Sequence, residues 1–275
     1  MPPALIAALA TGFNLPNVCD LPPAAAELPG KSLLHDLNAL GFRHIRLPID
    51  PTNCVRAERA FVRCLDAVID RILGAGFCPL ARYSRGRGGG ERRCARNHPA
   101  AGDLIASALR FVAERANDLP TDRVAIELLN EPPLETADWR PLRQRLVREV
   151  RAQAPRHTLI WSASRNQTIE ETIDDPGPGD RNAVAAVHYY YPMVFTHQGQ
   201  TWGSTPFAAI KALPFPFSAT DVRSAISAPS SSPKDAPTAS PSSTPPQSSH
   251  GTRSASHETS RRCAPGRRGR AGRLS

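Results

Sequence analysis

Two hydrophobic patterns alternate along this chain. The nearly continuous apolar run Val124–Leu129 is typical of a strand buried in a parallel sheet. Elsewhere apolar residues recur at helical spacing, as they do at Phe61, Leu65, Val68 and Ile72. Strand and helix patterns follow each other at intervals of about 30 residues, which predicts a parallel sheet with right-handed crossovers.

The expected elements can be placed by residue number. Strands are expected over residues 11–14, 44–49, 124–129, 157–161 and 182–187, and helices over residues 33–40, 57–73, 101–112, 139–150 and 208–213. Ser32 is a candidate cap for the first of these helices, and Gly41 is expected to close it.

A further strand is expected to begin at Phe77, but its pattern fails. Pro79 and the glycines of residues 86–90 argue against a strand, so we expect a poor one. No Gly-Lys-Ser/Thr follows, which excludes a phosphate-binding loop. We interpret residues 78–100 as an atypical Arg- and Gly-rich insert or as an out-of-frame translation, and residues from about 219 onward as a second out-of-frame stretch.

The strand at Val124–Leu129 ends in Asn130 and Glu131, followed by two prolines that remove backbone donors and stop the ladder. Side chains at the carboxyl ends of the strands form the active-site face of a β/α barrel. Glu131 is therefore the first candidate catalytic residue. The alternative is a solvated glutamate in a turn.

Four short motifs follow in order along the chain. They are Gly12-Phe13-Asn14, the segment 40–48 with its Arg46-Leu47-Pro48, Asn130-Glu131-Pro132 and His188-Tyr189-Tyr190. In this order and at expected strand ends, they resemble the cellulase-like glycoside hydrolases of family 5 over roughly residues 10–215. The resemblance implies a (β/α)8 TIM barrel, here incomplete with about six strands. It also implies a retaining mechanism, a β-glucan or related oligosaccharide as substrate, and no metal or organic cofactor.

The resemblance also assigns roles to residues. Glu131 would be the acid/base, and Asn130 would bind the sugar hydroxyl next to the reacting carbon. Arg46 would lie beneath the catalytic carboxylates, His188 would line the cleft, and Tyr190 would orient the nucleophile. From the residues alone, Arg46 could equally reach solvent and His188 could be a satisfied histidine at a strand end. Trp202 could stack on a sugar ring or serve in ordinary packing.

A retaining glycosidase requires a second carboxylate, which would come from a strand after His188. After Tyr189 the only glutamate is Glu258, which lies in a Ser- and Arg-rich tail, and Asp221 and Asp235 follow no strand pattern. Glu127 is better interpreted as an internal residue paired with a cation such as Arg46. No nucleophile is found, so we expect very low hydrolytic activity.

Composition divides the chain. Residues 1–227 are expected to form the barrel, and residues 228–275, rich in Ser, Pro and Arg, a disordered tail. The net charge of +9 arises from this tail, with eight basic against two acidic residues, and from residues 78–100, with six arginines against one glutamate. Neither segment interleaves aromatic residues as base-stacking surfaces do, so nucleic-acid binding is the least favoured function.

The six cysteines show neither a Cys-x-x-Cys pair nor regular spacing, which argues against a disulfide framework and against a zinc site. No run reaches the roughly 18 apolar residues of a membrane span, and no export signal is evident, so the compartment stays open. The alternative function is a non-catalytic carbohydrate-binding protein.

Overall fold

Six parallel strands form one sheet, in the order β1-β2-β3-β4-β5-β6. The computed structural model describes residues 1–22, 27–83, 99–201 and 206–227. The strands are β1 (Gly12–Asn14), β2 (His44–Ile49), β3 (Cys78–Tyr83), β4 (Ala125–Glu127), β5 (Thr158–Ser162) and β6 (Ala183–Ala186). Within the described ranges β1 and β6 do not pair with each other, so the curved sheet stays open. The predicted incomplete (β/α)8 barrel is confirmed.

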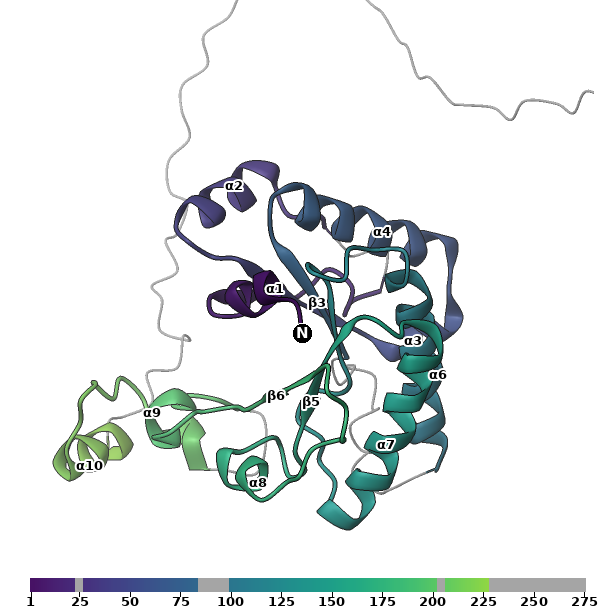
Figure 1. The fold of residues 1–275 in the computed structure, drawn as a ribbon. Coiled ribbons are helices and arrows are strands. Elements are labelled where there is room, and N and C mark those ends of the chain that lie inside the picture. Colours follow the sequence, from purple (N-terminus) through teal and green to yellow (C-terminus); the bar gives the residue numbers. More distant parts are fainter. Residues whose placement is uncertain (23–26, 84–98, 202–205, 228–275) are drawn as a thin grey trace, which may run out of the picture.

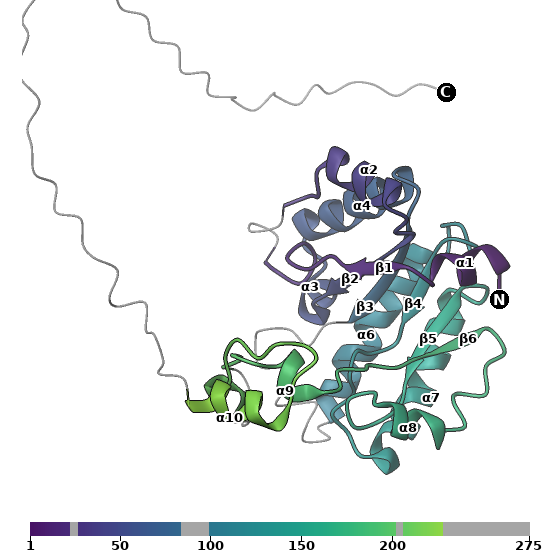
Figure 2. The same ribbon diagram turned by 90° about the vertical axis from the view of Figure 1, so that its left-hand side faces the viewer.

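Helices cover the outer face of the sheet, and a short helix covers part of its inner face (Figures 1 and 2). The helical segments are α1 (Pro3–Ala8), α2 (Lys31–Ala39), α3 (Pro51–Arg56), α4 (Arg59–Gly74), α6 (Pro99–Ala116), α7 (Thr136–Gln153), α8 (Ile169–Ile173), α9 (Met193–Thr196), the 3-10 helix η2 (Pro206–Ala209) and α10 (Ala219–Ser227). Helices α4, α6 and α7 lie along the outer face, whereas α1 lies on the inner side.

Two apolar cores hold these layers together. The larger core lies between the sheet and the outer helices, and it contains the helically spaced residues Phe61, Leu65, Val68 and Ile72 of α4. The smaller core lies on the inner side, where Leu5 of α1 packs in one cluster with Leu80 and Ile160 of the sheet. Both faces of the central strands are therefore buried, which explains their continuous apolar runs.

Strand β3 corrects one prediction. Residues Cys78–Tyr83 pair with both β2 and β4, so the expectation of a poor strand is wrong. The Cys78 N–H donates to the Arg43 carbonyl on the β2 side. Successive N–H groups of a strand point to opposite edges, so the N–H that Pro79 lacks would have pointed toward β4. Pairing with β4 begins only at Leu80, and Pro79 therefore removes no bond from the ladder. Of the predicted insert at 78–100, residues 84–98 lie outside the described residues.

Three smaller expectations also change. The N-cap of α2 is Gly30, with no side-chain capping bond, so Ser32 is not the cap, although Gly41 follows the helix with a φ of 97° as expected. The helix expected over residues 57–73 is α4, which begins two residues later at Arg59, and the short helix α3 before Ala57 was not expected. The helix expected over residues 208–213 is the shorter η2. The predicted disordered tail, residues 228–275, lies outside the described residues.

Ala57 offers a direct test of the turn between α3 and α4. This exposed residue follows α3 in the left-handed conformation, with a φ of 46°, where a non-glycine residue costs roughly 1–2 kcal/mol. We expect Ala57→Gly to raise the free energy of unfolding by about 0.5–1 kcal/mol in urea titrations, less than the full cost because glycine gains freedom in the unfolded chain. The matched control, Gly41→Ala, should lower it by about 1 kcal/mol. Equal effects of the two variants would contradict this explanation.

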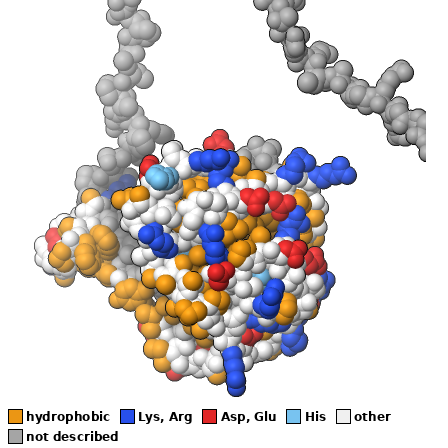
Figure 3. Space-filling model, turned by 45° about the horizontal axis from the view of Figure 1, so that its top comes forward, with side chains coloured by type: hydrophobic (Ala, Val, Ile, Leu, Met, Phe, Trp, Pro, Cys, Tyr) orange, Lys and Arg blue, Asp and Glu red, His pale blue; other side chains and the backbone are white. Residues whose placement is uncertain are grey.

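Apolar and charged side chains are distributed unevenly over the surface. Figure 3 shows Lys, Arg, Asp and Glu interspersed over the helical part of one face, with apolar side chains gathered over the α9–α10 segment. Ile210, Leu213 and Ala225 form a small separate core in this segment. The helices described are all too short or too polar to cross a membrane.

Candidate active site

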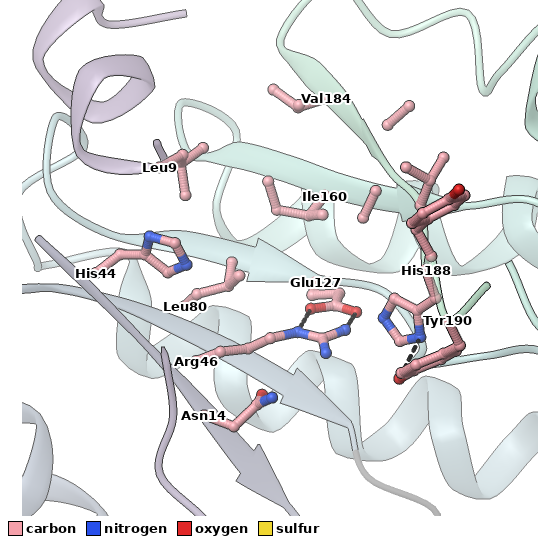
Figure 4. Close-up of a pocket in the computed structure, with 14 residues that line it drawn as sticks. Leu9, Asn14, His44, Arg46, Leu80, Glu127, Ile160, Val184, His188 and Tyr190 are labelled. Atoms are coloured by element: carbon pink, nitrogen blue, oxygen red, sulfur yellow. Dashed lines mark hydrogen bonds and ion pairs between the residues drawn. The ribbon is translucent and has the colours of Figure 1, made fainter. Parts of the chain in front are cut away.

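A cavity of about 490 Å³ opens on the inner side of the sheet (Figure 4). Polar side chains from the first two strands, from β4 and from the residues after β6 line it together with apolar residues of the inner core. The polar lining residues are Asn14, His44, Arg46, Glu127, His188 and Tyr190. The open sheet thus brings three of the predicted site residues, Arg46, His188 and Tyr190, to one cavity.

Arg46 and Glu127 form an ion pair in this cavity. The Arg46 Nε donates to Glu127 Oε2 at 2.7 Å, and Nη2 donates to the other carboxylate oxygen. The Glu127 side chain is fully buried, and that of Arg46 is 13% exposed. The two strands that carry them flank β3, and their inward side chains meet across it. The expectation that Glu127 is an internal residue paired with Arg46 is confirmed.

Asn130 lies next to this pair. Its Oδ1 accepts a hydrogen bond from Arg46 Nη2 at 3.1 Å, and the residue is 8% exposed. Strand β4 ends at Glu127, so Asn130 belongs to the loop, where the hydrogen bond from Arg46 is one of its contacts. Arg46 therefore fixes both a strand residue and a loop residue on the floor of the site.

Glu131, His188 and Tyr190 form a second group. The His188 Nδ1 and Glu131 Oε1 atoms lie 2.6 Å apart, so one proton is shared between them, and the tautomer of the ring decides which atom donates. The Tyr190 hydroxyl donates to the same carboxylate oxygen at 3.4 Å. The rings of His188 and Tyr190 meet edge to face, with centroids 5.7 Å apart. Glu131 does not line the cavity itself, but it contacts two side chains that do.

The local sequence explains how Glu131 reaches this position. It follows β4 with a φ of 45°, a conformation rare for glutamate, and Pro132 prevents the strand from continuing. His188 and Tyr190 follow β6 two residues apart, so both side chains project to the same side. The motif His188-Tyr189-Tyr190 thus places its first and third residues on Glu131 and leaves Tyr189 67% exposed.

Gly12 has a steric role in the first motif. It pairs with His44 across β1 and β2, and a Cβ at this position would lie 2.3 Å from the imidazole ring. The ring therefore lies over the glycine, where His44 Nδ1 contacts the Ala8 carbonyl at 3.0 Å and one face of the ring lines the cavity. Only glycine leaves room for this arrangement.

Two residues at the site were not predicted from the sequence, and one predicted site residue lies outside the described residues. His44 stands inside a longer motif, and Gln167, whose side-chain Oε1 accepts from the Glu131 N–H at 3.1 Å, lies in a polar loop after β5; neither carries a recognisable sequence signal. Trp202 lies outside the described residues. Across the ranges that the structure covers, no group of three or more His, Cys, Asp or Glu side chains could hold a metal ion.

Comparison with protein families and curated sequences yields three matches. The family model for cellulase (glycosyl hydrolase family 5) matches residues 10–224. Endoglucanase 3 of Fibrobacter succinogenes is 29% identical over 119 residues, which cover 42% of this chain and 18% of that protein. Cellodextrinase A of Ruminococcus flavefaciens is 31% identical over 84 residues, covering 30% and 25%. The matched regions thus span a quarter or less of the length of these relatives.

Solved structures share the fold at low identity. The endoglucanase Cel5A of Thermotoga maritima superposes with a TM-score of 0.63 and 23% identity over 74% of this chain and 68% of its own. The cellulose synthase subunit Z of Clostridioides difficile superposes with a TM-score of 0.64 and 18% identity, over 77% and 71%. At such identities the likeness establishes the fold alone.

Proposed function

Because the chain belongs to glycosyl hydrolase family 5, we propose that its cavity binds a β-linked glucan chain and that Glu131 is the proton donor to the glycosidic oxygen. The observation that carries the proposal is the contact of Glu131 with His188 at the edge of a 490 Å³ cavity. Structures of the similar Thermotoga maritima endoglucanase contain cellobiose or mannotriose, which supports a carbohydrate ligand.

The proposed chemistry begins with a proton on Glu131. As water attacks the anomeric carbon and the glycosidic bond breaks, Glu131 gives its proton to the departing oxygen, which would otherwise leave as an unstable alkoxide, and the proton that the water loses passes to solvent. His188, the partner of Glu131, is close enough to return a proton after each turnover, because a 2.6 Å contact lets the proton pass without a bridging water. Tyr190 donates to the carboxylate oxygen and holds it in place.

The sugar would contact the polar residues of the cavity. Asn14, His44 and Arg46 come from the first two strands and offer donors and acceptors to hydroxyl groups. Asn130 lies beside Arg46 next to the cavity. The phenol ring of Tyr190, which is 43% exposed at the cavity, offers an apolar surface for the ring face of a sugar. This combination of apolar and polar lining is typical of a site for an extended polar ligand.

Retaining hydrolysis also requires a second carboxylate, the nucleophile. A retaining mechanism places the nucleophile about 5–5.5 Å from the acid/base, on the opposite side of the scissile bond. Among the described residues that line the cavity, Glu127 is the only carboxylate, and Arg46 binds both of its oxygens. It also belongs to the strand that leads into Glu131. We therefore propose that hydrolysis by this chain is slow because the part of the chain that the structure describes places no carboxylate to attack.

Binding and hydrolysis can be tested together. In calorimetry with cellotetraose we expect binding by the unchanged chain and by Glu131→Gln, because the substitution keeps the shape of the side chain. Release of reducing sugar from soluble cellulose should be at least about 10³-fold below that of an intact family member. Rapid hydrolysis that disappears in Glu131→Gln would contradict the absence of a nucleophile. No binding by either protein would contradict the proposal as a whole.

Azide offers a stereochemical test of the same point. This small anion can attack the anomeric carbon of 2,4-dinitrophenyl β-cellobioside while the bond to the phenolate oxygen breaks. A single displacement inverts the configuration, so the expected product is the α-cellobiosyl azide. A β-azide would require two displacements, and hence a protein nucleophile, and would contradict the proposal.

The second candidate is a carbohydrate-binding protein without catalysis, which the same cavity supports. In that case calorimetry would show cellotetraose binding, but azide would give no product with the dinitrophenyl substrate. Calorimetry and product analysis of one protein preparation therefore separate the two candidates.

A further inference from the structure

The loop after β5 has an unusual backbone. Arg165, Asn166 and Gln167 are three successive non-glycine residues with positive φ values of 46°, 67° and 67°. Such residues rarely adopt this conformation, and a run of three persists only where surrounding contacts hold it. Together with Glu131 they are four of the seven non-glycine residues with positive φ in the described part of the chain.

These contacts run to the segment that carries Glu131. The Glu131 N–H donates to the side-chain Oε1 of Gln167 at 3.1 Å. Further along the same two segments, the Asn166 N–H donates to the Pro132 carbonyl at 3.0 Å and the Arg165 N–H to the Leu134 carbonyl at 3.1 Å. The left-handed run therefore presents successive donors to the loop after β4, and its last side chain accepts from Glu131 itself.

Gln167 also contacts the other member of the proton-sharing pair. The His188 N–H donates to the Gln167 carbonyl at 2.9 Å. One residue thus binds the backbone of Glu131 through its side chain and the backbone of His188 through its main chain. Gln167 is fully buried, and within the described residues its Nε2 has no hydrogen-bond partner, so the amide is held through its Oε1, which accepts from the Glu131 N–H.

We propose that Gln167 is a positioning residue for the Glu131–His188 pair. This inference rests on the proposed role of Glu131 as proton donor. Glu131 lies beyond the end of β4, where the ladder no longer provides an acceptor for its N–H, and Gln167 Oε1 takes that place. Without it the Glu131 N–H loses this acceptor, the left-handed conformation of Glu131 loses this support, and the carboxylate moves away from His188 Nδ1.

Nuclear magnetic resonance tests the geometry without any need for activity. The Nδ1 resonance of His188, detected through its carbon-bound ring protons and assigned with His188→Gln, reports the contact with Glu131. We expect this resonance to shift in Gln167→Met, which has nearly the same volume but no acceptor. Gln167→Asn, whose amide is one methylene shorter, should give the same result and serves if the first variant is insoluble.

The matched control is Thr158→Val. Thr158 is as buried as Gln167 and donates to Asn182 Oδ1 at 3.0 Å, but it lies at the opposite end of β5. This variant loses a part-buried side-chain hydrogen bond away from Glu131 and should leave the His188 resonance in place. An unchanged resonance in both Gln167 variants, or an equal shift in Thr158→Val, would overturn the proposal.

A leaving-group comparison provides the functional readout. In the azide reaction a dinitrophenolate leaves without protonation, whereas the phenolate of phenyl β-cellobioside needs the proton of Glu131. We expect Gln167→Met to slow the phenyl substrate at least about tenfold and the dinitrophenyl substrate less than about twofold. Equal slowing of both would mean a general structural defect and would overturn the positioning role. If azide gives no product even with the unchanged chain, the proposed function fails, while the His188 resonance still decides the role of Gln167.

Discussion

Replacing Arg46 with methionine is expected to lower the free energy of unfolding by about 3–5 kcal/mol. The substitution keeps the apolar stem of the side chain but removes the cation that binds both oxygens of Glu127. Glu127 is fully buried in the folded chain, so its charge would lose its partner in a poorly solvated position. The loss of Arg46 also leaves Asn130 Oδ1 without this donor.

Urea titration monitored by far-ultraviolet circular dichroism measures this effect. Since folded domains are stable by only about 5–15 kcal/mol, the midpoint should fall markedly. The control is the double variant Arg46→Met/Glu127→Leu, which removes the buried charge together with its partner and should recover most of the loss. A single variant as stable as the unchanged chain would mean that Glu127 is not buried as an ion.

Asp175→Asn is the second substitution with a large expected effect. Asp175 accepts from Arg143 Nη1 at 3.0 Å and from Nη2 at 2.8 Å, and the two side chains are 2% and 1% exposed. Arg143 also lies over the Trp161 ring, with Cζ 4.9 Å from its centroid. Asparagine leaves the guanidinium buried without a counter-ion, and we expect a loss of about 3–5 kcal/mol in urea titrations at pH 7.

The pH dependence of this loss follows from the ionisation of Asp175. Burial raises its pKa, but the hydrogen bonds from Arg143 and from the Gly177 N–H outweigh burial and hold the pKa below its usual value. A carboxyl group with a lowered pKa in the folded state stabilises the protein above its unfolded pKa of about 3.9, and this contribution disappears as the pH falls through the folded-state pKa. The difference between the unchanged chain and Asp175→Asn should therefore shrink below about pH 4.

An exposed pair provides the control for Asp175. Asp103 accepts from Arg145 at 2.8 Å, the same distance as in the buried pair, but the side chains are 63% and 42% exposed. Because water solvates both partners, Asp103→Asn should cost less than about 1 kcal/mol. Similar losses in Asp103→Asn and Asp175→Asn would show that burial does not determine the strength of these pairs.

The Arg46–Glu127 pair and the Glu131–His188 pair have different roles. Arg46 and Glu127 neutralise each other on the cavity floor and stabilise the fold. Glu131 and His188 share a proton above them and are supported by Gln167 from the loop after β5. A substitution in the first group should change stability, whereas one in Gln167 should change the geometry of the second group.

The sequence alone determined the fold class and much of the site. Hydrophobic periodicity is a local property, so the runs at 44–49 and 124–129 and the helical spacing of residues 61–72 were sufficient to predict a parallel sheet with outer helices. Through their resemblance to family 5, the short motifs indicated Glu131, His188 and Arg46 as candidate site residues at strand-end positions, which meet at one edge of a parallel sheet. The pairing of Glu127 with Arg46 followed from a charge inside an apolar run, which requires a partner.

Only the tertiary structure decided the remaining features. Pro79 is compatible with β3 because of the point at which β4 begins to pair, and this register is not encoded near the proline. Gln167 supports Glu131 through a loop whose conformation depends on contacts with residues more than 30 positions away. Polar loop residues have no periodicity, and their partners are chosen by the packing of separate strands. The sequence can therefore indicate the proposed proton donor but not the residue that we propose positions it.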